Sequence, residues 1–538
     1  MPSLSLQSLS SPEWFTILLS LGPLLRLKLA TTAIYNLFLH PLAHVPGPFW
    51  TRASGIPSWY YAISGKRHIW LWQQFQIYGN KIRPEPNTVL FCDPDAYADI
   101  YGAKSNVRRS HFYLAFRSKL SDKTTLTTID VAEHAKKRRL LSMCLTDNMV
   151  RAASSFVVKH VDRWNQLLEE EGDKVGGWSA SVDFSHKVDA LVLDVIGDLS
   201  LGRSFDIKEP GANPLKEVPH CLAAYLRFSY SLVLWLKPRG LDRAIKLITP
   251  PAVQKYHNFV VNSVTDRLAL HKEQVDKPES ERRQDVFYFL CDAKDPDTGS
   301  PAYTEGELRG ESSLLIIAGF DTTSISLSGI FFYLTGDQRR YKKLVDEILT
   351  TFESREDIVY GPKLLGCQYL KACVDEGMRL TPSGTSELPR EVLPGGIQIK
   401  GEHYPAGTIV GTVPWADSRN QDVFGDAHVF RPERWIVDEA TGVTKDDVSR
   451  IRANFHPFLS GPGSCIGKNL ALAEIYITVA RTLHRLDVRR APGSTLGGGA
   501  PELGWGARDS NQMQLRDAYL SLRQGPEVQF RKRQRLSA

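Results

Sequence analysis

Apolar residues dominate one long stretch near the start of the chain, from Trp14 to Leu39. A helix of this length is long enough to cross the roughly 30 Å hydrocarbon core of a bilayer. Two cations, Arg26 and Lys28, interrupt the stretch, and each costs about 2.5–3.5 kcal/mol at the centre of a membrane. The pattern favours a single span or an embedded hairpin-like anchor, and the alternative is a buried N-terminal helix of a soluble protein.

A proline-rich segment, His40 to Pro48, follows and ends the predicted helix with a stiff, extended exit. Residues 1–13 contain Glu13 and no Lys or Arg, whereas cations lie within and after the apolar stretch. By the positive-inside rule, the body of the protein then lies in the cytosol. We expect residues 1–45 to form the anchor and the start of the hinge, and residues 46–538 to form one folded domain.

Downstream, the periodicity indicates mostly helices with a few short strands, and the clearest helix begins at Thr304. Thr304 and Glu307 have the spacing of a capping box, in which each side chain bonds to the other residue's backbone N–H. The pattern continues to about Leu334, so this helix spans roughly 45 Å. Its centre is apolar on all sides, which predicts a buried helix that crosses the whole domain.

The middle of this helix reads Ala318-Gly-Phe-Asp-Thr-Thr323, an unusual choice for a core helix. Gly319 weakens the helix, and the hydroxyls of Thr322 and Thr323 compete with its backbone hydrogen bonds. We therefore expect a locally opened turn, where the Asp321 carboxylate and a threonine hydroxyl hold water and deliver protons to a reaction. The alternative is a packing notch made of small residues.

The composition limits the class of protein. The 538 residues are 42% hydrophobic and 23% charged, which provides enough apolar material for a large core. A formal charge of +6 is too small for this length to indicate a nucleic-acid partner. The seven cysteines are scattered and odd in number, so we expect no disulfide framework. Cys367 and Cys373 lack the paired spacing of a zinc site, and we interpret them as packing residues.

One cysteine stands apart, because Cys465 lies in a glycine-rich loop directly before an amphipathic helix. Gly461, Gly463 and Gly467 allow tight turns and a close approach to a flat group. The following helix directs its N-terminal amides toward the sulfur, and we expect the loop and the helix to lower the pKa of this thiol. Such a thiolate is a typical haem-iron ligand. A small buried cysteine is the alternative, whereas a G-x-G-x-x-G dinucleotide loop is excluded because the last gap is one residue too long.

A second candidate constellation consists of charged residues that lie far apart in the sequence. Glu376 and Arg379 are three residues apart and therefore share one face of a helix, and Arg434 follows in the segment Phe430-Arg-Pro-Glu-Arg-Trp435. An isolated pair of this kind is ordinarily a surface ion pair of little energetic value. Together, the three side chains predict a buried cluster that fixes the loop carrying Cys465.

Four motifs stand in the order found in one known family: the helix centre from Ala318 to Thr323, the E-x-x-R pair, the P-E-R-W turn, and the loop from Phe458 to Gly467. From about Pro46 to its end, the chain resembles the cytochrome P450 family of haem-thiolate monooxygenases. The anchor and hinge are similar to those of microsomal members, and Leu39-His-Pro-Leu42 resembles filamentous-fungal members that act in secondary metabolism. The resemblance implies a mainly α fold with small β-sheets (α+β), preceded by the anchor helix.

The resemblance also implies roles for individual residues. Cys465 is expected to be the axial ligand of haem b, and Asp321 and Thr322 are expected to manage proton delivery. Gly463 departs from the family pattern, which usually has a basic residue here that pairs with a haem propionate, and His134 stands where a tryptophan is usual. The remaining expected haem contacts are Arg138, Arg390, Phe458, Gly461, Gly467, Ala318 and Gly319.

The implied reaction is the insertion of one oxygen atom from O2 into a lipophilic small molecule, with a fungal secondary metabolite as the expected substrate. Electrons would come from an NADPH-dependent cytochrome P450 reductase, so NADPH is used only indirectly, and cytochrome b5 is a second candidate donor. The implied location is the endoplasmic reticulum membrane, with a single-pass anchor and a cytosolic catalytic domain. One alternative is a haem-thiolate isomerase, dehydratase or peroxide-driven enzyme, and another is a non-catalytic haem-binding membrane protein. The intact pair Asp321 and Thr322 disfavours both.

The sequence also predicts the walls of the substrate cavity, a docking site for the reductase and the state of the basic chain end. The walls of the substrate cavity are expected to include Phe112, Tyr113, Phe116, Phe320 and residues 382–388. A cationic cluster suited to an acidic reductase consists of Lys136, Lys137, Arg139 and Lys468, with a merely solvated helix face as the alternative. The basic tail, residues 531–535, is expected to be a solvated chain end.

Overall fold

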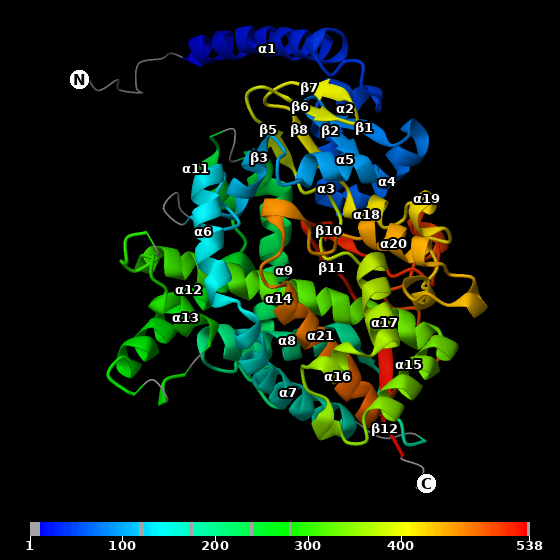
Figure 1. Ribbon diagram of the computed structural model, residues 1–538. Coiled ribbons are helices and arrows are strands. Elements are labelled where there is room, and N and C mark those ends of the chain that lie inside the picture. Colours follow the sequence, from blue (N-terminus) through cyan, green and yellow to red (C-terminus); the bar gives the residue numbers. More distant parts are fainter. Residues whose placement is uncertain are drawn as a thin grey trace.

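A computed structural model of the chain describes residues 11–117, 123–171, 176–236, 240–278, 281–283, 285–295 and 297–534. The first ten residues of the predicted anchor and Arg535 of the basic tail lie outside the described residues. Figure 1 shows most of the strands gathered at the end of the molecule next to α1, while helices form the larger, opposite part.

The α-helices, in chain order, are α1 (Ser11–Ile34), α2 (Phe49–Ala53), α3 (Ile56–Ser64), α4 (Arg67–Tyr78), α5 (Pro94–Tyr101), α6 (Val131–Cys144), α7 (Asp147–Glu170), α8 (Phe184–Leu201), α9 (Val218–Phe228), α10 (Leu234–Leu236), α11 (Asp242–Ile248), α12 (Pro251–Gln274), α13 (Val286–Asp292), α14 (Glu305–Gly336), α15 (Gln338–Thr351), α16 (Pro362–Leu365), α17 (Gln368–Leu380), α18 (Pro414–Asp417), α19 (Gln421–Phe424), α20 (Lys445–Ala453) and α21 (Lys468–Arg485).

The strands are β1 (Lys81–Glu85), β2 (Thr88–Phe91), β3 (Val107–Arg109), β4 (Val182–Asp183), β5 (Arg390–Val392), β6 (Ile397–Ile399), β7 (Glu402–Tyr404), β8 (Ile409–Thr412), β9 (Leu486–Arg490), β10 (Arg516–Ala518), β11 (Leu520–Leu522) and β12 (Glu527–Lys532). The largest sheet has the order β1-β2-β8-β5-β3, and smaller sheets are formed by β4-β12-β9, β6-β7 and β10-β11. This helix-rich fold with small sheets confirms the predicted class.

The long helix α14 crosses the centre of the molecule (Figure 1). It begins with the predicted capping box, because the Thr304 hydroxyl accepts from the Glu307 N–H (3.3 Å) and the Glu307 carboxylate accepts from the Thr304 N–H (3.0 Å). The expected opening near Gly319 is wrong, since the described residues 305–336 form one continuous α-helix. A Cβ at Gly319 would lie 2.5 Å from Ile196 of α8, so this glycine permits close helix packing.

Among the described residues, α14 is the helix that is long and apolar enough to cross a membrane, but most of it is buried in the protein core. The N-terminal helix α1 has a different environment. Its leucines Leu24, Leu25, Leu27 and Leu29 are each more than half exposed, so they have little protein to pack against. After the π-helical turn Tyr35–Leu39, the hinge joins the domain where the Arg83 N–H donates to the Pro46 carbonyl (2.7 Å).

The basic tail is more ordered than expected. Residues 527–532 form β12, which pairs antiparallel with β9. Arg531 and Arg533 form ion pairs with Asp487 at 3.0 and 2.7 Å, and Lys532 forms one with Glu169 at 3.1 Å. Arg531 and Lys532 are exposed to solvent as expected, but sheet pairing fixes this chain end and brings all three residues to acidic partners, and Arg533 is half-buried.

Candidate functional site

The loop before α21 holds Cys465 in a tight turn. The Cys465 N–H donates to the Phe458 carbonyl at 2.7 Å, which closes the loop on itself. Gly461 has a φ of +60°, and a Cβ at this position would lie 2.3 Å from the Tyr101 carbonyl oxygen. Glycine is required there both by the backbone conformation and by the close approach of α5.

The Cys465 side chain is exposed, whereas every other cysteine in the chain is buried or, in the case of Cys291, half-buried. Although solvent reaches the side chain, desolvation by the surrounding protein raises the pKa of the Cys465 thiol, and the Gly467 N–H, Arg138 and Lys468 act in the opposite direction. The Gly467 N–H thus lowers the pKa as expected, but desolvation outweighs it, so the expectation of a lowered thiol pKa is wrong. A metal ion deprotonates a thiol that it binds, so an iron ligand does not need a low pKa beforehand.

Two arginines contact the Cys465 loop directly. Arg138 of α6 donates to the Ser464 carbonyl and to the Ser464 hydroxyl, the latter at 2.8 Å. Arg390 of β5 lies over Gly463, where an added Cβ would be 2.8 Å from the Arg390 Nη2. The glycine at position 463 therefore leaves room for the guanidinium of Arg390.

Arg109 and His134 lie at the same place, and sequence reasoning missed Arg109. Arg109 is the direct cross-strand partner of Arg390 in the β3–β5 pair. Burial, together with the positive charges of Arg390 and Arg138, lowers the pKa of Arg109. Burial, together with the positive charges of Arg109, Arg138 and Arg390, lowers the pKa of His134 to about 4. The Nε2 of His134 is buried without a hydrogen-bond partner among the described residues.

We call Arg109, Arg138, Arg390 and His134 the basic pocket. The hydrogen bonds of its arginines go to carbonyl and hydroxyl oxygens, and within the described parts of the chain none of the three pairs with a carboxylate. Like charges that face each other across a strand pair repel. The basic pocket therefore suits an anionic group that is not part of the protein.

One face of α14 is open even though the helix is otherwise buried. Ala318 is exposed in the middle of the helix, and Leu314 and Thr322, one turn away on either side, are half-buried. The Thr322 hydroxyl donates to the Ala318 carbonyl at 2.6 Å. Ala318 and Thr322 thus border open space, whereas Gly319 faces α8.

Asp321 lies deeper than its neighbour Thr322. Burial raises the pKa of Asp321 to about 7, with Arg523 opposing this shift and Asp189 adding to it. The Asp321 Oδ1 is 3.4 Å from the Arg523 Nη1, and the Oδ2 is buried without a hydrogen-bond partner among the described residues. Arg523 was not expected from the sequence, because it comes from a segment about 200 residues later in the chain.

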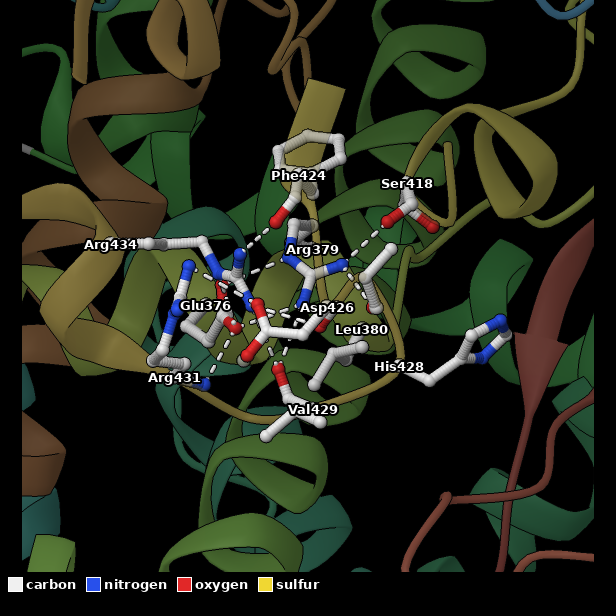
Figure 2. A network of polar contacts seen from close by, with 12 residues as sticks. Glu376, Arg379, Leu380, Ser418, Phe424, Asp426, His428, Val429, Arg431 and Arg434 are labelled. Atoms are coloured by element: carbon white, nitrogen blue, oxygen red, sulfur yellow. Dashed lines mark hydrogen bonds and ion pairs between the residues drawn. The ribbon is translucent and has the colours of Figure 1, made fainter. Parts of the chain in front are cut away.

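The predicted charged cluster is brought together at the C-terminal half of α17. Arg379 donates twice to the Glu376 carboxylate, at 2.9 Å each, and the Arg434 Nε donates to the same group at 3.0 Å. All three side chains are fully buried. Burial opposes ionisation of Glu376, but Arg379 and Arg434 hold its pKa below the usual value. Figure 2 shows the Glu376 carboxylate between the two guanidinium groups, with Arg431 alongside.

This cluster connects to the Cys465 loop through an aromatic contact. The Trp435 indole N–H donates to the Glu376 carboxylate at 3.0 Å. The Trp435 ring lies 4.7 Å from the ring of Phe455, which opens the segment that carries Cys465. The buried charges thereby hold the start of the loop in place.

An aromatic cage joins several of the predicted substrate walls. Phe112 and Phe116 lie 5.1 and 4.8 Å from the ring of Tyr519, and Phe112 also faces Tyr230 at 6.3 Å. The Tyr230 hydroxyl donates to Ser386, within the predicted wall segment 382–388. Phe320 is placed elsewhere: it is two positions, about 200°, around α14 from Ala318 and lines a separate cavity with Asp321. Sequence reasoning missed Tyr230 and Tyr519, because nothing in their local sequence marks them.

The predicted cationic docking cluster is only partly available. Lys137 is buried and bonded to Glu307 at 2.6 Å, so its inclusion was wrong. Lys136 pairs with Asp295 at 2.7 Å, and Arg139 lies 3.7 Å from Asp297. The acidic turn before α14 thus neutralises much of this helix face, and Lys468 remains exposed beside the Cys465 loop.

Comparison with known proteins agrees with this geometry. The family model for cytochrome P450 matches residues 58–496. The chain is 32% identical over 507 residues to cytochrome P450 monooxygenase AKT7 of Alternaria alternata, covering 93% of this chain and 94% of the relative. It is also 32% identical over 544 residues to cytochrome P450 monooxygenase fscF of Fusarium equiseti, covering 98% of both chains. The chain therefore belongs to the cytochrome P450 family, as an oxidoreductase of the monooxygenase class that is similar to fungal members.

Proposed function

We propose that this protein is a haem b-dependent monooxygenase that inserts one oxygen atom from O2 into a lipophilic small molecule, a fungal secondary metabolite. The observation that carries the proposal is the solvent-reachable Cys465 thiol beside the basic pocket. Residues 46–538 form the catalytic domain, and residues 1–45 form the anchor and the start of the hinge.

The residues present fit a haem. Cys465 is a suitable iron ligand, and the carboxylate-free basic pocket suits two propionate groups, since guanidinium–carboxylate contacts are among the strongest hydrogen bonds in proteins. The unpartnered Nε2 of His134 offers a further donor. Arg109 supplies the cation that position 463 lacks. When bound, haem supplies the activation of O2, which thiolate ligation favours.

Asp321 and Thr322 are suited to proton delivery. Because burial raises the pKa of Asp321 to about 7, its carboxyl group can give and regain a proton near neutral pH. The Thr322 hydroxyl borders the open face of α14 and is bonded to the Ala318 carbonyl. By rotating away from this carbonyl, the hydroxyl can orient a water molecule toward the reacting oxygen.

The aromatic cage supports a lipophilic substrate. Phe112, Phe116, Tyr230 and Tyr519 present ring faces and edges, and the Tyr230 hydroxyl is already bonded to Ser386 and Asp517. An isomerase, dehydratase or peroxide-driven enzyme on the same fold is not favoured, because such reactions need no proton delivery to reduced oxygen and Asp321 and Thr322 are both present.

We further propose that α1 anchors the protein in the endoplasmic reticulum membrane as a single-pass helix, with the domain in the cytosol. The exposed leucines of α1 support this, since they have little protein to pack against. The apolar segment 228–235 is buried or half-buried, whereas Trp50, Ile56 and Tyr60 on α2 and α3 are each more than 60% exposed. These three side chains are better placed to rest on the membrane surface.

The electron donor in this proposal is NADPH–cytochrome P450 reductase, with cytochrome b5 as a second donor. Lys468 is an exposed cation beside the Cys465 loop that can attract an acidic partner. No nucleic acid takes part in the proposed reaction.

The proposal is tested by reconstituting the full-length protein with the reductase in phospholipid vesicles under 18O2. Metabolites extracted from cells with and without the protein serve as the substrate pool. We expect NADPH-dependent formation of a product that carries one 18O atom. A product that forms without NADPH, or that takes its oxygen from water, would contradict the monooxygenase function and favour one of the other reactions on this fold.

A further inference from the structure

A cleft lies along β9, the edge strand of the sheet β4-β12-β9. Its volume is about 400 Å3, within the roughly 300–1,000 Å3 of small-molecule sites. Thr335, Gln338 and Tyr341, from the junction of α14 and α15, form the opposite wall. Figure 1 shows β12, the neighbour of β9, at the end of the molecule opposite α1. No lining residue that the structure describes belongs to the Cys465 loop, the basic pocket or the aromatic cage, so the cleft is a separate site.

This cleft carries an excess of positive charge. Arg489, Arg490 and Arg531 line it, and Asp487 is the acidic lining residue in the described part of the chain, which leaves two positive charges without compensation. The Asp487 carboxylate is itself shared between Arg531 at 3.0 Å and Arg533 at 2.7 Å. Among the described residues, neither Arg489 nor Arg490 pairs with a carboxylate. A cleft lined by charges of one sign attracts ions of the opposite sign, so this cleft favours an anion.

Arg490 has a hydrogen-bond donor that nothing in the described protein satisfies. Its Nη2 donates to the Phe332 carbonyl near the end of α14, and its guanidinium lies over the Phe332 ring at 4.3 Å. The Nε is buried without a hydrogen-bond partner among the described residues, which is an unfavourable state for a charged group. Burial lowers the pKa of Arg490, and Tyr333 rather than a carboxylate opposes the shift. A bound anion would supply the missing acceptor.

Arg489 enters the cleft from the other face of β9, because successive side chains of a strand point to opposite faces. Its Nε donates to the Gln529 Oε1 at 3.0 Å, and its guanidinium lies over the Trp178 ring at 4.2 Å. Arg531 lies over the same ring at 4.5 Å, so Trp178 holds both guanidinium groups at the cleft. Within the described residues, Arg489 makes no other side-chain hydrogen bond, which leaves its two Nη atoms for a ligand.

A tetrahedral anion suits donors that come from two sides. A carboxylate is flat and is matched by a single guanidinium, whereas a phosphate presents oxygens in several directions, and arginine forks bind these oxygens strongly. We propose that the cleft binds the phosphate group of a soluble small molecule, with Arg489 and Arg490 as its main ligands. The proposed site goes beyond the monooxygenase function and does not depend on it. The position of β12 opposite α1 favours a soluble ligand over a lipid headgroup.

The test titrates the full-length protein, held in phosphatidylcholine vesicles, with inorganic pyrophosphate in an isothermal calorimeter. Sodium chloride keeps the ionic strength constant, so that general charge screening does not change. We expect saturable binding of one pyrophosphate per protein. Arg489→Gln and Arg490→Gln should each weaken the affinity by about tenfold or more, the loss expected when a hydrogen bond to a charged group is removed. Citrate, a carboxylate anion of similar charge, should bind more weakly than pyrophosphate.

Arg485→Gln is the matched control, because Arg485 directly precedes β9 but is already paired with Glu169 at 2.7 Å. Its affinity should equal that of the wild type. Equal affinities in the wild type, Arg489→Gln and Arg490→Gln, or citrate that binds as tightly as pyrophosphate, would overturn the proposal. Pyrophosphate binding that disappears in vesicles containing phosphatidic acid would assign the cleft to a lipid headgroup instead. If Arg490→Gln fails to fold, the affinity of Arg489→Gln decides.

Discussion

The cluster around Glu376 gives the prediction whose size follows most directly from the structure. The fully buried Glu376 carboxylate accepts five hydrogen bonds: two from Arg379 and one each from Arg434, Trp435 and the Arg431 backbone. The substitution Glu376→Ala leaves two buried guanidinium groups without their counter-ion. Breaking a buried ion pair in this way typically costs about 3–5 kcal/mol, which lowers the ratio of folded to unfolded protein by about a hundredfold or more.

Two measurements check this prediction: the haem-to-protein ratio after purification and the midpoint of guanidinium unfolding. We expect Glu376→Ala to lose stable haem, because the cluster holds the Trp435–Phe455 contact at the start of the Cys465 loop. Glu305→Ala on α14 is the control, since its pair with Arg309 is exposed and should contribute about 0.5 kcal/mol or less. A Glu376→Ala protein with wild-type haem content and an unfolding midpoint equal to that of the control would refute the reasoning.

Other predictions follow from the same structure. Deleting residues 1–39 should release the protein into the soluble fraction with its haem site intact, because the site lies after Pro46. A truncated protein that stays on membranes would indicate that Trp50, Ile56 and Tyr60 form a second anchor. Thr322→Ala should lower the ratio of product to NADPH by about 10²-fold or more and release peroxide, since positioned proton donors contribute about 10²–10⁴ in rate. Thr322→Ser should keep its coupling, and equal coupling in both variants would make the hydroxyl structural. Arg109→Gln should weaken haem retention, measured as the rate of haem transfer to apomyoglobin, and an unchanged rate would remove Arg109 from the haem site.

Sequence reasoning succeeded where one local pattern determines one structure. The capping box at Thr304 and Glu307 needs only adjacent turns of a helix, and it is present at the expected place. The family motifs predicted contacts between residues far apart in the sequence. They linked Glu376 and Arg379 with the distant Arg434, which no hydrophobic periodicity connects with them. The helix-rich fold followed from the same resemblance.

Sequence reasoning failed where the outcome depends on strand register or on competition between tertiary effects. Arg109 reaches the basic pocket only because β3 pairs with β5 in a register that places it opposite Arg390. The sequence predicts that Lys137 is an exposed cation, yet its side chain is buried and forms an ion pair with the capping residue Glu307. For Cys465, the glycine loop and helix start predict a lower thiol pKa, but desolvation by the surrounding protein outweighs both. The strand register, the burial of an ion pair and the pKa of a thiol all depend on three-dimensional packing, so the local sequence does not predict them.

The central claim is that Cys465 ligates a haem iron, and one measurement tests it most directly. The carbon monoxide difference spectrum of the reduced protein should show the strongly red-shifted Soret band that thiolate ligation produces. Cys465→Ser should lose this band, because a neutral hydroxyl cannot replace thiolate donation, whereas Cys291→Ser, a change at a half-buried cysteine on α13, should keep it. A red-shifted band that survives in Cys465→Ser would show that the iron ligand is another residue.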